Sequence, residues 1–352
     1  MNEMPKYWDN AATTPVDQRV LDAMLPYFAE IFGNASSNHI YGRKAKAAID
    51  KARNYVADLI NADSKEIFFT SGATESINWA IKGLLESNAE KGNHIITVKT
   101  EHKAVLNTCE YLETKGVEVT YLNVNENGMI DLEELKNSIR KETSLVCVMY
   151  VNNEIGVIQE IEQIGNICRD ANVAFFCDAT QAAGKVPIDV QSDNIDMLSL
   201  SGHKFNGPKG IGALYVKKGI KLTPLIHGGG QESGLRGGTY NTPLIVGMGE
   251  AARIAKIDFD KKVQSIRAKR LEIETNLLEN NIATINFQNQ KTAPHIISAS
   301  LINKDAEDFI LEYAGEFAIS TGSACASSLV QKSHVIEEVF SAIQNNIIRI
   351  SI

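Results

Sequence analysis

The most constraining feature of the sequence is a regular alternation of short apolar runs and helical patterns between about residues 65 and 216. Several runs consist almost entirely of Val, Ile, Leu and Phe, as is typical of strands covered on both faces. Between the runs, apolar residues recur at spacings of three and four, which predicts helices. The predicted strands are residues 66–70, 94–98, 117–122, 145–151, 173–178, 197–201 and 212–216.

This alternation predicts an α/β fold with a doubly wound, mostly parallel sheet. Asp131, with Glu134 three positions later, predicts a capping box at the start of one of the helices. In such sheets, ligands bind just beyond the carboxyl ends of the strands. We therefore look for functional residues directly after the predicted strands.

The pattern changes after the sheet region. Thr242 and Pro243 predict the N-cap and first residue of a long charged helical region that continues to about residue 281. We interpret residues 15–255 as a large domain, and residues 1–14 together with 256–352 as a smaller α+β domain. Its remaining predicted elements are strands at 296–302, 315–321 and 347–352 and helices at 306–313 and 335–340.

The composition argues against several classes of function. Acidic residues outnumber basic ones by 43 to 35, a formal charge of −8, which disfavours nucleic acids and anionic membranes as partners. No apolar run approaches the ~18 residues of a membrane helix. The first ten residues also lack the basic and apolar segments of a signal peptide, so we expect a cytoplasmic protein.

The five cysteines divide into two groups. Cys109, Cys147, Cys168 and Cys177 lie in apolar periodic surroundings, where cysteine usually behaves as a small buried hydrophobe. Cys325 instead lies in a run of Gly, Ser and Ala that is too small and polar for a core position. Five cysteines are few for a chain of this length and odd in number, so we expect no disulfide framework. No C-x-x-C pair occurs, so we expect no structural zinc site. Cys325 is either a silent loop cysteine or a nucleophile.

Three motifs follow predicted strands, and each has an ordinary explanation as well as a functional one. The small-residue turn at 69–75 could cradle a phosphate at a helix N-terminus, or be a tight turn with Thr74 as N-cap. Asp178 could cap the next helix, and Lys204 could be a solvated charge. Together, however, a phosphate cradle, a strand-end carboxylate and a loop lysine are the parts of a pyridoxal 5'-phosphate (PLP) site.

With these motifs, the sequence resembles the cysteine desulfurases, which belong to the class V aminotransferase group of fold-type I PLP enzymes. The resemblance covers nearly the whole chain, and its motifs occur in the family's order. These motifs are residues 9–15, 33–37 with His39, 71–75, 101–102, 152–156, Asp178 with Gln181, 201–204, 228–232, 236–241, 322–325 and 349–351.

The resemblance implies how PLP is held. Lys204 would bind the cofactor covalently, Asp178 would pair with the ring nitrogen, and His102 would stack on the ring. For His102, the alternative from sequence alone is a capping or surface histidine at a helix start. Gln181 and Asn153 would contact the ring hydroxyl side. The groups that would hold the phosphate are Ala73, Thr74, Ser201 and His203, joined by Thr239 from the other subunit of a homodimer.

The resemblance also implies the reaction. Arg349, with Asn153, would bind the carboxylate of L-cysteine, and Cys325 would attack the substrate sulfur, leaving L-alanine and a protein persulfide. The alternative for Arg349 is a surface arginine on an edge strand. The sulfur would pass to an iron–sulfur scaffold protein and other acceptors. No intrinsic metal is expected, apart from transient ligation of an iron–sulfur cluster by Cys325.

Two other functions are compatible with the same motifs. One is a different PLP reaction, such as transamination or selenocysteine cleavage, because a fold does not fix its chemistry. The other is a cofactor-binding assembly partner without turnover. The run around Cys325 resembles the family's group with the longer catalytic loop, which favours general iron–sulfur supply.

The sequence departs from the family pattern at two places. Ala35 stands where the family commonly has proline, which we expect to alter only the stiffness of the loop. The sequence ends directly after residues 349–351, where relatives usually continue through further helical residues. We therefore expect a small domain without its last helices.

Overall fold

The computed structural model describes residues 4–321, 333–340 and 345–352. Its centre is a seven-stranded sheet with the strand order β2-β8-β7-β6-β5-β3-β4. Strand β8 runs antiparallel to both of its neighbours, and the other pairs are parallel. The strands are β2 (Ile67–Thr70), β3 (His94–Val98), β4 (Glu118–Leu122), β5 (Thr143–Met149), β6 (Ala174–Asp178), β7 (Met197–Ser201) and β8 (Gly212–Val216). The predicted fold class is confirmed, and each of the seven strands predicted for this sheet is present within two residues of its predicted ends.

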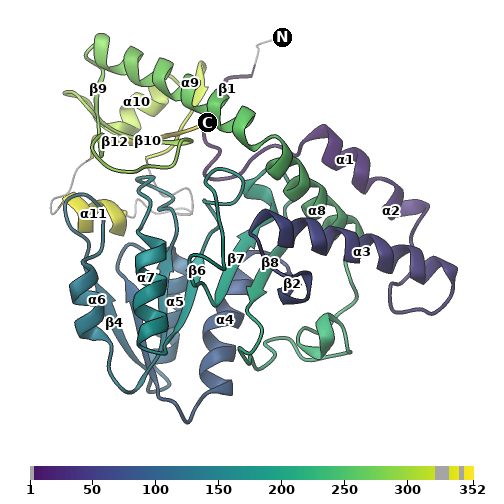
Figure 1. The fold of residues 1–352 in the computed structure, drawn as a ribbon. Coiled ribbons are helices and arrows are strands. Elements are labelled where there is room, and N and C mark those ends of the chain that lie inside the picture. The colour runs from purple at the N-terminus through teal and green to yellow at the C-terminus, as the bar shows by residue number, and fades with distance from the viewer. Residues whose placement is uncertain (1–3, 322–332, 341–344) are drawn as a thin grey trace.

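Helices cover both faces of this sheet (Figure 1). On one face, α4 (Ala73–Ser87) and α5 (Lys103–Glu113) pack against strand residues such as Cys147 and Phe176. The neighbouring residues Val146 and Phe175 point to the opposite face, as the two-residue period of a strand requires. That face is covered by α3 (Ile40–Leu59), α6 (Leu132–Ser138), α7 (Ile161–Asp170) and α8 (Thr242–Ile257).

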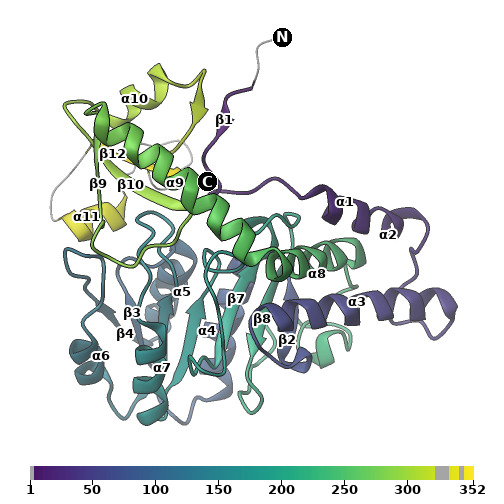
Figure 2. The ribbon, with the colours of Figure 1, turned by 45° about the horizontal axis from the view of Figure 1, so that its top comes forward.

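The helices α1 (Gln18–Met24), α2 (Pro26–Ala29) and α3 precede the first predicted strand, and our sequence analysis assigned no helix there. The buried face of α3 consists largely of small residues, among them Gly42, Ala45 and Ala52, so few large apolar side chains mark it in the sequence. Small residues are required here because α3 and α8 lie side by side (Figure 2). A Cβ atom on Gly249 of α8 would come within 2.5 Å of the Ala52 Cα.

The long helical region after the sheet also differs from the prediction. Asn241, rather than Thr242, is the N-cap of α8, because its side chain accepts from the Leu244 N–H. The region is also interrupted at Asp258, where α8 ends and α9 (Phe259–Glu279) begins. Asp131 caps α6 by accepting from the N–H groups of Glu133 and Glu134.

A smaller antiparallel sheet of strands β12 (Ile347–Ser351), β10 (Ile296–Leu301) and β9 (Ala283–Ile285) lies beside the large one, and α9 extends from the large sheet to the small one (Figure 1). Ile273 and Leu277 of α9 pack against its apolar face. The other elements here are α10 (Ala306–Glu312), α11 (His334–Phe340) and the parallel pair of β1 (Lys6–Tyr7) with β11 (Phe317–Ala318). The division into domains 15–255 and 1–14 with 256–352 stays a prediction.

Residues 8–14, which we call the N-terminal strap, connect the two sheets. At one end the Ser351 N–H donates to the Trp8 carbonyl at 2.8 Å, and the Asn10 N–H donates to the Ser351 carbonyl at 3.0 Å. At the other end the Thr14 N–H donates to the His203 carbonyl at 2.9 Å. The strap therefore runs from β12 to the loop after β7. None of the described helices combines the length and apolarity of a membrane span.

Candidate functional site

A cavity of about 530 Å³ lies at the carboxyl ends of the parallel strands, bordered by the N-terminal strap and by β12. Ten of the predicted site residues line it: Ala73, Thr74, His102, Asn153, Asp178, Gln181, Ser201, His203, Lys204 and Arg349. Thr239 is exposed and is not among the lining residues, and Cys325 lies outside the described residues. The structure thus brings together residues from six separate segments of the chain.

The N-terminus of α4 provides an anion-binding end of the cavity. The N-cap is Gly72, which contributes no side-chain cap, so the interpretation of Thr74 as N-cap is wrong. The first N–H groups of α4, including those of Ala73 and Thr74, have no acceptor within the helix and form the positive end of its dipole. Small residues are required around this turn, because a Cβ on Gly212 would come within 2.6 Å of the Gly72 Cα. These features fit a bound phosphate.

Ser201, the last residue of β7, and His203, in the turn that follows, line the same cavity. The Nδ1 of His203 lies 3.1 Å from the Thr13 hydroxyl of the strap. Burial, reinforced by the positive charge of Lys204, lowers the pKa of His203 to about 4. The imidazole is therefore neutral at pH 7 and can contact a phosphate as a hydrogen-bonding group.

Asp178 ends β6 and is held firmly at the cavity wall. Its Oδ1 accepts from the Ser199 hydroxyl at 2.8 Å, from the Thr180 N–H at 3.0 Å and from the Thr180 hydroxyl at 2.5 Å. The structure describes every residue between β6 and β7, and no helix begins there, so Asp178 does not cap a helix. A buried carboxylate at this position fits a protonated ring nitrogen as its partner.

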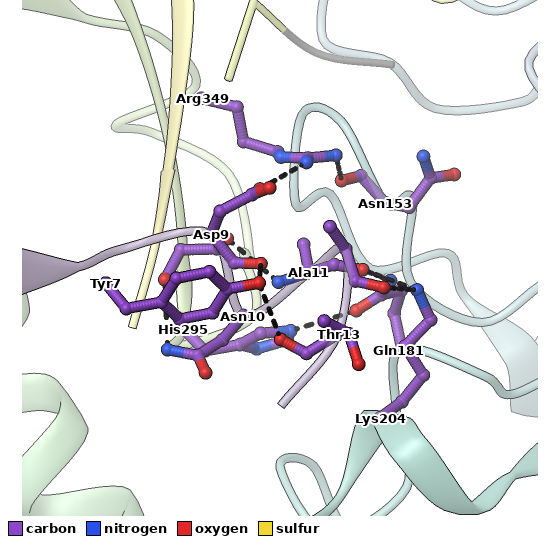
Figure 3. Close-up of polar contacts among 12 residues, drawn as sticks. Tyr7, Asp9, Asn10, Ala11, Thr13, Asn153, Gln181, Lys204, His295 and Arg349 are labelled. Carbon is purple, nitrogen blue, oxygen red and sulfur yellow. Dashed lines mark hydrogen bonds and ion pairs between the residues drawn. The ribbon is translucent and has the colours of Figure 1, made fainter. Parts of the chain in front are cut away.

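Lys204 closes a single turn of 3₁₀-helix directly after β7. Its Nζ donates to the carbonyl oxygens of Ala11 and Ala12, at 2.6 and 2.8 Å. Carbonyls only accept hydrogen bonds, so the strap holds the amine through its protons. The alternative of a solvated surface charge is therefore wrong, because the amine is half-buried and points at the strap (Figure 3).

His102 has the capping role that the sequence offered as an alternative, and it also borders the cavity. As the N-cap of α5, its Nδ1 accepts from the Ala104 N–H at 3.1 Å, and its ring lines the cavity. Burial lowers the pKa of His102, and although the charge of Asp178 opposes this, the charge of Lys204 adds to it. Because Nδ1 accepts, the proton of the neutral ring lies on Nε2.

Arg349 comes from the edge strand β12, yet it is only 2% exposed, so the alternative of a surface arginine is wrong. Its Nη1 donates to the Asn153 carbonyl at 3.0 Å, and its Nη2 donates to Asp9 Oδ1 at 2.7 Å (Figure 3). Its Nε is buried and has no partner in the described part of the chain. This unpaired donor is suited to an incoming carboxylate.

Several residues at this site were given no role in the sequence analysis. Glu101, before His102, is buried and accepts from the Met149 N–H at 2.6 Å, and burial raises its pKa well above the ordinary value, with Asp178 adding to the shift. The Nε2 of His334 lies 2.9 Å from the Glu101 carbonyl. Asp9 and Glu101 fall within recognised motifs, but no local pattern indicates which distant residues they contact.

The four cysteines predicted to be buried are fully buried. Burial raises the pKa of Cys109 and Cys168 to about 12, and that of Cys147 and Cys177 well above the ordinary value. At neutral pH these thiols are protonated and inaccessible. Within the described residues, no group of His, Cys, Asp and Glu side chains could hold a metal ion.

The chain is similar to known proteins of one family. The class-V aminotransferase family model matches residues 6–352. The "Cysteine desulfurase IscS" of Neisseria meningitidis serogroup C (strain 053442) is 51% identical over 335 residues, covering 94% of this chain and 83% of the relative. The "Cysteine desulfurase IscS" of Rickettsia rickettsii (strain Iowa) is 48% identical over 341 residues, covering 96% of this chain and 83% of the relative.

Solved structures are similar along almost the whole chain. A structure titled "NIFS-LIKE PROTEIN" superposes with a TM-score of 0.91 at 38% identity, covering 99% of this chain and 94% of its own. Another, titled "SspA in complex with cysteine", gives a TM-score of 0.88 at 42% identity, with coverages of 99% and 98%. The chain therefore belongs to the class-V aminotransferases and, among them, to the cysteine desulfurases.

Proposed function

We propose that this chain binds PLP at Lys204 and uses it to move the sulfur of L-cysteine to Cys325, releasing L-alanine. The observation that carries the proposal is the meeting of four groups in one cavity: the open N-terminus of α4, the buried Asp178, the amine of Lys204 and the buried guanidinium of Arg349. They match the phosphate, ring nitrogen and aldehyde of PLP, and the carboxylate of an amino acid.

PLP, when bound, supplies an electron sink for negative charge that develops at the substrate α-carbon. In this proposal Asp178 would keep the ring nitrogen protonated, and the N–H groups of Ala73 and Thr74 would bind the phosphate with Ser201 and His203. His102 would stack on the ring. Gln181 and Asn153 would contact the ring hydroxyl side.

The protein groups also bind the substrate and move protons. The planar fork of Arg349 binds the α-carboxylate, and Asn153, whose carbonyl fixes Nη1, helps to orient it. The Lys204 amine, once free, takes the α-proton. His102 carries its proton on Nε2 and can donate it within the cavity.

The sulfur transfer balances without an added oxidant. The thiolate of Cys325 attacks the substrate sulfur, so that an S–S bond forms while the substrate C–S bond breaks. The carbon keeps the electron pair of that bond and takes up a proton, giving L-alanine, and Cys325 carries the persulfide. We propose an iron–sulfur scaffold protein and other thiol acceptors as its destinations, and the cytoplasm as the compartment.

A homodimer is supported by an exposed apolar surface around α2 and the start of α3. Phe28, Phe32, Ile40 and Tyr41 are 59, 68, 52 and 52% exposed, and the rings of Phe32 and Tyr41 lie 5.7 Å apart. An exposed apolar patch of this kind marks an interface. In the dimer, Thr239 of the partner subunit would complete the phosphate site, in keeping with its exposure and its absence from the lining of the cavity in its own chain.

The test is to incubate the purified chain, loaded with PLP, with L-cysteine in the presence of a reductant. We expect a visible absorbance band that changes on addition of L-cysteine, and equal amounts of alanine and sulfide. Production of a keto acid without alanine would instead identify a transaminase. A stable band without any product would identify a cofactor-binding partner.

A further inference from the structure

His295, which our sequence analysis did not consider, lies behind the cavity and is connected to it through Gln181. It precedes β10 and is fully buried. Its Nε2 lies 3.3 Å from Gln181 Oε1, and the Gln181 Nε2 donates to the Ala11 carbonyl at 2.8 Å. The same carbonyl accepts from Lys204 (Figure 3). The chain of contacts therefore leads from His295 to the lysine.

The donors and acceptors along this chain follow from chemistry alone. The Ala11 carbonyl can only accept, so the NH₂ end of the Gln181 amide must face it. The oxygen end then faces His295, whose Nε2 must carry a proton and donate. The Gln181 amide nitrogen has a second N–H besides the one given to Ala11, and Gln181 lines the cavity.

The surroundings of His295 keep its ring neutral. Burial is the main cause that lowers its pKa well below the ordinary value, and positive charges on Lys185, Arg270, Lys262 and Arg349 act in the same direction. A neutral imidazole has one N–H, which the Gln181 oxygen uses. The other nitrogen, Nδ1, is buried without a partner in the described part of the chain.

We propose that His295 is a positioning residue for the PLP site: by donating from Nε2 to Gln181 Oε1, it fixes the NH₂ end of Gln181 toward Ala11 and the cavity. Without this donor, the buried amide oxygen loses its partner and the amide is free to rotate, which removes an N–H from the ring hydroxyl side. The inference rests on the proposed function, because His295 acts on PLP binding only through the contact that Gln181 is proposed to make with the cofactor.

A matched pair of variants separates this role from packing. His295→Gln and His295→Met are of similar length and both remove the ring, but only glutamine carries an N–H donor near the position of Nε2. We measure PLP binding to the unloaded protein by absorbance titration. We expect the PLP dissociation constant to rise about tenfold in His295→Met, the equivalent of one lost hydrogen bond, and to stay within about twofold of wild type in His295→Gln.

A second measurement tests whether His295 acts through Gln181. In a Gln181→Leu background, His295→Met should weaken PLP binding no further, because the amide that it orients is gone. The control is His94→Met, which removes a second buried histidine, bonded to Thr143 and Thr120 at the opposite end of the sheet. It should lower the melting temperature and leave PLP binding unchanged.

The inference would be overturned if PLP binding were weakened equally in His295→Gln and His295→Met. It would also be overturned if His295→Met weakened PLP binding as strongly in the Gln181→Leu background as it does alone. The proposed function fails in a different way, namely if the wild-type chain itself binds no PLP or forms no alanine from L-cysteine. The two failures are therefore distinguishable.

Discussion

The two sides of the cavity are built differently. On the side of the large sheet, Asp178 is the last residue of one strand and Lys204 lies in the turn directly after the next. The carboxylate of Asp178 is held by close neighbours, Thr180 in the loop that follows and Ser199 on the adjacent strand. On the side of the small sheet, Arg349 is held by Asp9, which lies 340 positions away in the sequence. The cofactor side is thus set by the parallel sheet, and the substrate side by the meeting of the two chain ends.

This difference suits the two sides of the cavity to different tasks, cofactor binding and substrate binding. The groups on the large sheet are fixed by a rigid, buried scaffold, which suits residues that hold a cofactor throughout turnover. The guanidinium of Arg349 is fixed by the strap, and the strap also contacts Lys204 through Ala11 and Ala12. Variants on the two sides should therefore fail differently: on the cofactor side in chemistry, and on the strap side in substrate binding.

The largest effect is expected on the cofactor side, from Lys204→Ala. Removing the amine removes both the covalent attachment of PLP and the base at the α-carbon, so alanine formation should fall by about 1,000-fold or more. PLP should still bind through its phosphate, with an altered visible spectrum. Lys217→Ala, which alters a partly exposed lysine just after β8, is the control and should behave as wild type. An unchanged spectrum in Lys204→Ala would contradict the assignment.

Cys325→Ala should also abolish the release of alanine and sulfide, but for a different reason. The cofactor side is intact in this variant, so its visible band should be present and should still respond to L-cysteine. In wild type, mass spectrometry after substoichiometric L-cysteine should find the persulfide on Cys325 and on none of the four buried cysteines, whose raised pKa values keep their thiols protonated. Persulfide on Cys109, Cys147, Cys168 or Cys177 would show that the nucleophile is misassigned.

Arg349→Lys tests the substrate side. Lysine keeps the charge but cannot reproduce the planar fork that contacts Asn153, Asp9 and a carboxylate together. We expect the apparent affinity for L-cysteine to fall about 10- to 100-fold while the spectrum without substrate is unchanged. The measurement is a spectral titration with L-cysteine. A loss of PLP binding in this variant would contradict the division between the two sides.

The sequence predicted which residues line the cofactor side of the cavity, because the pattern that marks each of these residues is local. An apolar run that ends in Asp178, or in Ser201 and Lys204, defines both a strand and the residues at its end, and the topology of a parallel sheet then brings these ends together. The roles of individual residues came from the resemblance, since the motifs alone left ordinary explanations open.

The sequence did not predict in the same detail how the N-terminal strap and the small sheet meet the cavity, because these contacts are not local. Nothing near Asp9 indicates that it pairs with Arg349, and nothing near His295 indicates that it contacts Gln181. Helix α3 was missed for a different reason. Its face toward α8 consists largely of small residues, which let the two helices approach closely but contribute little hydrophobicity to the sequence pattern.

The smallest effect is expected from Asp9, which contacts no reacting group directly. Its carboxylate, with a side chain 18% exposed, holds the Arg349 Nη2 at 2.7 Å, and its own carbonyl accepts from the Tyr7 hydroxyl at 3.0 Å. Asp9→Ala leaves the buried guanidinium with the Asn153 carbonyl as its one described hydrogen-bond partner. A guanidinium that is less well fixed should bind L-cysteine about 3- to 10-fold more weakly.

Asp9→Asn is the matched control, since its amide oxygen can still accept from Nη2. If Asp9 acts by fixing the orientation of Arg349, the asparagine variant should bind L-cysteine more like wild type than the alanine variant does, and neither should alter PLP binding. If Asp9 instead competes with the substrate carboxylate for the guanidinium, both variants should bind L-cysteine more tightly than wild type. Spectral titration with L-cysteine distinguishes the two by the sign of the change, and only the first outcome is compatible with a strap that prepares the substrate side of the cavity.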